Sequence, residues 1–184
     1  MAPSLPPNLT RYAPALRELL AREELNDLGP GRPVAALRPA LARLSPAALD
    51  PRHPPRDLDF AHCCLSALWL LYDFLDESHT LSQDIHTSTG SFWHGIMHRR
   101  EPDAWNSKYW FRQVGRHPVI DQLARTAPTL GYNYTDAAAF VDFCESVRGT
   151  NTPQEQTARA IQQLEWRLLF DYCYQAAWPA EPTE

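Results

Sequence analysis

The sequence predicts an all-α protein, an irregular bundle of seven or eight helices around a central apolar helix at about 58–77. Two observations favour this class. Apolar residues recur at helical spacing in almost every segment between the 17 prolines and 7 glycines. No pair of alternating segments joined by a hairpin turn is present. The 184 residues fit a single domain, 1–184, with flexible ends expected at 1–9 and 179–184.

The first half of the chain is expected to form three helices. Regularly spaced leucines predict a helix over 14–28, which ends at Gly29-Pro30-Gly31 because glycine and proline terminate helices. A shorter helix follows at 33–44. The range 58–77 is the most apolar part of the sequence and begins after Asp57, a good N-cap residue. We therefore place it at the centre of the bundle.

The second half of the chain carries further helix signals. The polar range 78–91 is expected to be a helix end and a loop. Thr152-Pro153-Gln154-Glu155 combines a capping box with proline at the first helical position, which is a specific start signal. Helices are expected over 91–101, 103–115, 118–129, 135–149 and 153–177.

Composition limits the classes of partner. The chain has 17 basic and 22 acidic side chains and a net charge of −5, which is unusual for a protein that binds nucleic-acid phosphates. It contains no run of about 18 apolar residues that would cross a membrane. We therefore expect no nucleic-acid partner and no membrane partner. The four cysteines form no C-x-x-C motif, which is typical of reduced thiols in a soluble cytoplasmic protein: Cys63, Cys64, Cys144 and Cys173.

Unusual residues concentrate in the middle third of the chain. Five of the seven histidines and three of the six tryptophans lie between residues 79 and 117. The range 94–117 contains five basic side chains and only two acidic ones, although the whole chain has a net negative charge. Lys108, the only lysine, is among them. Packing alone does not require such a reversal of charge, so we expect a functional site here.

The expected helix at 91–101 places His94, His98 and Glu101 on one face, since each residue turns the helix by about 100°. Histidines four residues apart can act in acid–base catalysis or share a metal ion. The alternative is that this face is simply the solvated side of an amphipathic helix. With His79, the two histidines form a candidate three-histidine site for a divalent metal ion.

The next expected helix carries candidate ligand-binding residues. Aromatic rings beside basic groups can stack on a planar molecule while holding its carboxylate or phosphate. The alternative is that the basic side chains only cover aromatic residues of the core. With Arg99 of the preceding helix, the candidates are Trp105, Asn106, Lys108, Tyr109 and Arg112.

Asp73 lies on the apolar range 58–77, where a buried carboxylate needs a partner. One hypothesis is that Asp73 or Glu101 orients the catalytic imidazole of His94 or His98. The alternative is a structural ion pair of Asp73 with Arg99 or Arg112 that only fixes the packing of two helices.

The block WHGIMHRREPDAWNSKYW at 93–110 resembles one found in a group of uncharacterised all-helical proteins from bacteria and fungi. The resemblance covers about residues 72–118. Because no activity is assigned to that group, the resemblance implies that this segment acts as a unit and implies no chemistry.

Three functions remain open from the sequence. The first is a pocket that binds a small anionic molecule, with histidine acid–base chemistry of the hydrolase or lyase type. The second is a protein–protein adaptor with a tryptophan and arginine surface. The third is a metal-binding helical bundle. The pocket requires His94, His98 and Asp73 to converge, whereas the adaptor requires Trp93, Trp105 and Trp110 on a convex patch.

Overall fold

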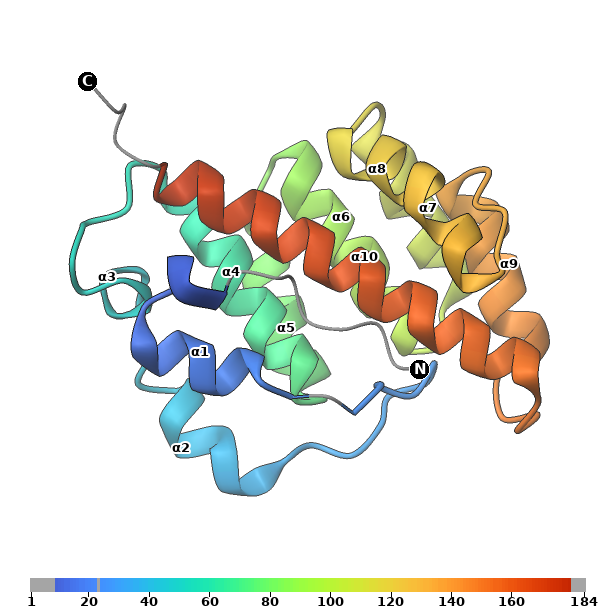
Figure 1. The fold of residues 1–184 in the computed structure, drawn as a ribbon, viewed down its shortest axis with the longest axis horizontal. Coiled ribbons are helices and arrows are strands. Elements are labelled where there is room, and N and C mark those ends of the chain that lie inside the picture. The colour runs from blue at the N-terminus through green and yellow to red at the C-terminus, as the bar shows by residue number, and fades with distance from the viewer. Residues whose placement is uncertain (1–8, 23, 180–184) are drawn as a thin grey trace.

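The computed structural model describes residues 9–22 and 24–179, and every regular element within them is a helix (Figure 1). Eight of the ten α-helices have seven or more residues, which confirms the predicted all-α class. The expected flexible ends, 1–9 and 179–184, lie outside the described residues except for Leu9 and Pro179. Within the described ranges, no helix is both long and apolar enough to cross a bilayer.

Most helices begin where the sequence places a capping residue. The Asp57 carboxylate accepts from the backbone N–H groups of Asp59 and Phe60, and the Thr152 hydroxyl accepts from Glu155. The helices are α1 (Pro14–Leu20), α2 (Arg38–Leu41), α3 (Pro46–Leu49), α4 (Leu58–Leu71), α5 (Leu75–Ser82), α6 (Ser88–Arg100), α7 (Ala104–Val114), α8 (Pro118–Thr126), α9 (Ala137–Val147) and α10 (Pro153–Ala177).

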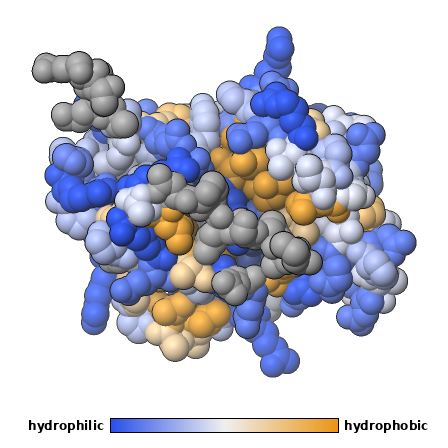
Figure 2. Space-filling model, in the orientation of Figure 1, coloured by the Kyte–Doolittle hydropathy of each residue, from blue (hydrophilic) through white to orange (hydrophobic). Residues whose placement is uncertain are grey.

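The core is built around α4 and α10. In Figure 1 the long helix α10 crosses the molecule from the turn after α9 to the region of α3, and it packs against α4, α8 and α9. Nine of the fourteen residues of α4 are buried, and the indole of Trp166 on α10 donates to the carbonyl of Ala67 on α4. On the face shown in Figure 2, hydrophilic side chains surround smaller hydrophobic patches.

The predicted central helix at 58–77 is wrong in its length, because two helices occupy this range. Helix α4 ends at Leu71, Asp73 has a φ of 66°, and α5 begins at Leu75. A positive φ is unfavourable for a residue other than glycine and ends an α-helix. In the range 78–91, where a helix end and a loop were expected, α5 ends at Ser82, residues 83–87 connect the two helices, and α6 already begins at Ser88.

Tertiary contacts explain the break after α4. The carbonyl of Leu71 accepts from the amide of Asn26, and that of Leu70 accepts from the guanidinium of Arg100. Asn26 and Arg100 also donate to the carboxylate of Asp73, over 2.7 and 2.6 Å. Distant side chains thus satisfy the carbonyl groups that a continuing helix would have used.

Helix α6 is longer than expected because it begins at Ser88, where the Thr87 hydroxyl accepts from the backbone of Gly90. It packs closely against α7. A Cβ atom on Gly95 would lie 3.1 Å from the ring of Phe111, and the Ser107 hydroxyl donates to the Gly95 carbonyl. This close approach fixes α7 beside the histidines of α6.

Candidate functional site: a three-histidine cluster

Three imidazole rings from two helices meet in the structure. His79 comes from α5, and His94 and His98 come from α6. One nitrogen of each ring can be chosen so that all three atoms lie within 4.8 Å of one another. Nε2 of His94 lies 2.9 Å from Nε2 of His98. The ring of His79 meets both rings of α6 edge-on, with centroids 4.7 and 5.3 Å away.

The two imidazoles of α6 are held in place by their surroundings. Every residue of α6 from Thr89 to Arg100 is buried, His94 and His98 included. The indole of Trp110 on α7 stacks on the His94 ring at 4.0 Å. Because α6 and α7 pack so closely, neither imidazole can turn away freely.

Glu101 determines where the protons of the two rings lie. Its carboxylate oxygen is 3.0 Å from Nδ1 of His98, and because a carboxylate only accepts, Nδ1 must donate. Nε2 of a neutral His98 then carries a lone pair, so the proton between the two rings belongs to His94. In this tautomer, Nδ1 of His94 carries no proton. This atom is buried and makes no hydrogen bond of normal geometry.

Both imidazoles of α6 are neutral at pH 7. Burial and the imidazoles of His98 and His79 lower the pKa of His94 to about 3, opposed by the backbone of Ser82. Burial also lowers the pKa of His98, against the opposing attraction of Glu101. Neutral imidazole is the form that binds a metal ion.

Asp73 and Arg99, two residues expected in the site, take part in ion pairs elsewhere. The Asp73 carboxylate is bound by Arg100 and Asn26, so it pairs with neither Arg99 nor Arg112 as the structural alternative expected. Arg99 is fully buried and pairs with Glu165 of α10. Both contacts fix the packing of α6 against its neighbours.

Two of the candidate ligand-binding residues of α7 are paired with other side chains of the protein, and the other three are exposed. Lys108 pairs with Asp142 of α9, and Asn106 donates to Asp103, the N-cap of its own helix. The other three residues form an exposed aromatic surface with a cation above it. Trp105 and Tyr109 stack at 6.2 Å, and Arg112 lies over Tyr109.

The tryptophans do not form the convex patch that the adaptor hypothesis requires. Trp93 is fully buried, with its indole N–H 3.4 Å from the sulfur of Cys173. Trp110 stacks on His94. Trp105 alone of the three is largely exposed, at 72%. His79, His94 and His98 converge instead, whereas Asp73, which the pocket hypothesis also required, lies in the ion pair with Arg100.

Sequence reasoning missed the role of Trp110 and the choice of Arg100 as the partner of Asp73. Trp110 follows His94 by sixteen residues across a turn, so helical spacing cannot relate the two. Arg100 is one of the five basic residues between 94 and 117, and no pattern in the sequence distinguishes it from Arg99 as the partner of Asp73.

The fold and the cluster define an all-helical protein with a group of three histidines, two of them buried and one half-buried. Comparisons with protein-family models, curated proteins and solved structures found no match to this chain.

Proposed function

We propose that the protein binds one divalent transition-metal ion through His79, His94 and His98 and uses it in a hydrolase or lyase reaction on a small anionic molecule. The observation that carries this proposal is the convergence of three imidazole nitrogens within 4.8 Å, two of them on buried, neutral rings.

The distances suit a metal ion. Two nitrogens that each bind a zinc-like ion at about 2.1 Å are separated by about 3.0 to 3.4 Å, depending on the coordination angle. The 2.9 Å between Nε2 of His94 and Nε2 of His98 is close to this range. The ring of His79 is only half-buried and would complete the set by a small movement.

The surroundings also favour a cation. Glu101 would keep accepting from Nδ1 of His98, the arrangement by which proteins commonly orient a metal-binding imidazole. With Nε2 of His94 bound to the ion, its proton would move to Nδ1, and the backbone of Ser82, which already opposes the lowering of the His94 pKa, is the acceptor available to that ring. Asp103 adds a second carboxylate near His98: burial lowers the pKa of His98, and the carboxylates of Glu101 and Asp103 oppose that shift.

The reaction class rests on the ligand set and on α7. Three protein ligands leave a coordination position for substrate, as in many catalytic zinc sites. A bound ion would supply Lewis-acid chemistry there. On α7, the exposed Arg112 offers a guanidinium for the anionic group of a substrate, beside the stacked rings of Trp105 and Tyr109.

The test is a titration of metal-stripped protein with Co²⁺, followed by visible absorption and calorimetry. We expect one equivalent to bind and to produce ligand-field bands. His79→Gln and His94→Gln should each abolish these bands. Glu101→Gln should weaken binding about 10-fold to 100-fold, because Glu101 positions a ligand without being one.

His86→Gln is the matched control, since His86 lies on the surface between α5 and α6. It should bind Co²⁺ like the wild type. Circular dichroism would verify that each variant is folded. A folded wild type that binds no Co²⁺, or binding that survives both His79→Gln and His94→Gln, would contradict the proposal.

A further inference from the structure

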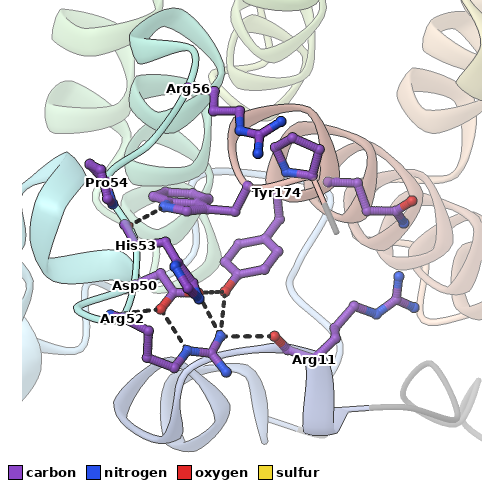
Figure 3. Close-up of a pocket in the computed structure, with 10 residues that line it drawn as sticks. Arg11, Asp50, Arg52, His53, Pro54, Arg56 and Tyr174 are labelled. Atoms are coloured by element: carbon purple, nitrogen blue, oxygen red, sulfur yellow. Dashed lines mark hydrogen bonds and ion pairs between the residues drawn. The ribbon is translucent and has the colours of Figure 1, made fainter. Parts of the chain in front are cut away.

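A second feature of the molecule lies away from the histidines, where the end of α10 meets the segment between α3 and α4. The structure has a hollow of about 780 Å³ there, within the range of small-molecule sites. Figure 3 shows its lining. The described residues around it are Arg11, Asp50, Arg52, His53, Pro54, Arg56, Tyr174, Gln175, Trp178 and Pro179.

One side of the hollow is a rigid polar network. Asp50 is buried, and both of its oxygens accept from the guanidinium of Arg52, over 2.7 and 2.5 Å. The phenol of Tyr174 donates to the same carboxylate over 2.8 Å. Arg52 holds the pKa of Asp50 at about 2, so this carboxylate stays ionised and paired. It therefore does not repel an anion as a free carboxylate would.

The three arginines of the hollow differ in whether they form an ion pair. Arg52 is paired with Asp50, and Arg11 is paired with Asp171 over 2.8 Å. The guanidinium of Arg56 makes no ion pair with any described residue. In the view of Figure 3, Arg56 and Arg52 lie on opposite sides of the Tyr174 ring. Among the residues that the structure describes, Arg56 thus has no acidic side chain paired with it.

The rest of the lining combines the apolar residues Pro54, Trp178 and Pro179 with His53 and Gln175. Trp178 is held by a hydrogen bond of 3.0 Å from its indole N–H to the His53 carbonyl. The backbone N–H of Arg56 donates to Ala177 at the end of α10 over 2.8 Å, which fixes the connector against the helix. Pro54 and Pro179 complete this side. Flat apolar walls with few polar groups are typical of sites for small organic ligands.

We infer that this hollow is a binding site for a small organic carboxylate with a flat apolar body, whose carboxylate pairs with Arg56 and whose body lies against Trp178. A single unpaired guanidinium matches a single carboxylate, which it can bind through two parallel hydrogen bonds. The lining comes from Arg11, from the segment between α3 and α4, and from the end of α10 with the two residues after it, and none of it belongs to the three-histidine cluster. This site is consequently independent of the proposed metal site.

The test is calorimetric titration of the full chain with 2-naphthylacetate and with 2-naphthylacetamide, which keeps the ring but has no charge. We expect the carboxylate to bind one equivalent and the amide to bind at least tenfold more weakly. Arg56→Gln should weaken carboxylate binding at least tenfold. The matched control is Arg125→Gln, on the exposed side of α8, which should change binding less than twofold.

Equal binding of the two probes would overturn the inference, as would carboxylate binding that Arg56→Gln leaves unchanged. A variant ending at Pro179 tests whether the acidic end of the chain occupies the hollow, because Glu181 and Glu184 lie among the last five residues of the sequence. If the full chain binds no carboxylate but the shortened chain does, the hollow belongs to the chain's own acidic end and the proposed ligand is wrong. Failure of both chains to bind also overturns it.

Discussion

Helix α6 carries two groups of buried polar residues that differ in how completely they are satisfied. At its end, the guanidinium of Arg100 donates to the Asp73 carboxylate and to the carbonyls of Gly29, Pro30 and Leu70. Six and two residues before Arg100, His94 and His98 are joined by one hydrogen bond, and His94 keeps a buried nitrogen without a partner of normal geometry.

We interpret the first group as structural and the second as the proposed metal site. A buried charge that is paired and fully hydrogen-bonded holds elements together, here the loop before α2 and the end of α4. Buried neutral groups with unused lone pairs leave capacity for a ligand. In the sequence both groups belong to one run, from His94 to Arg100, and look equally suited to a site.

Removing Arg100 should have the largest effect on stability. Arg100→Met leaves the buried Asp73 with Asn26 and a more distant Arg22, and it removes the donor to three backbone carbonyls. We expect a loss of about 3 to 5 kcal/mol in the free energy of unfolding, measured by urea denaturation. A loss below about 1 kcal/mol would show that this pair is not structural.

The buried pair of Arg99 and Glu165 lies between these two cases, because Nε and Nη1 of Arg99 and Oε1 of Glu165 make no hydrogen bond of normal geometry. Arg99→Met alone should cost about 3 kcal/mol, because it leaves Glu165 as an unpaired charge in the core. Arg99→Met combined with Glu165→Leu should recover most of that loss, since no charge remains buried. Urea denaturation of the two single variants and the double variant measures the recovery. A double variant as unstable as Arg99→Met would mean that the ion pair itself is indispensable.

The neutral histidines should make the metal-free protein sensitive to acid. His94 has a pKa of about 3 in the folded chain and about 6.5 when unfolded. Its contribution is therefore fully present above pH 6.5 and is lost as the pH falls toward 3, with a slope of up to about 1.4 kcal/mol per pH unit. Unfolding experiments at pH 7, 6 and 5 should give a shallower slope for His94→Gln. Equal slopes would show that the His94 ring is accessible to protons in the folded protein.

The smallest effect is expected on the exposed face of α7. Trp105 is 72% exposed and its ring contacts Tyr109. Trp105→Ala should change the free energy of unfolding by no more than about 0.5 kcal/mol, again by urea denaturation. A larger loss would place Trp105 in the structural framework and would remove it from the surface offered to a substrate.

The sequence predicted the type of most elements because their signals are local. Asp57 and Thr152 cap helices through backbone groups two or three residues away, and the expected helix at 153–177 has the observed bounds. The approach of His94 to His98 was also predictable, since a helix places residues four apart on one face. His79 was a candidate ligand from composition alone, and only the packing of α5 on α6 brings it to the pair.

The amino-acid sequence by itself determined the helical class, the main caps and the face shared by His94, His98 and Glu101. Tertiary structure alone decided that α4 ends before Asp73, that Arg100 and Asn26 bind that carboxylate, and that Trp110 covers His94. It also decided that the connector around Arg56 forms a hollow with the end of α10. The physical reason is the sequence separation over which each kind of interaction acts. Caps and helical periodicity act over a few residues, whereas the choice among several buried partners depends on which side chains the packed helices bring together.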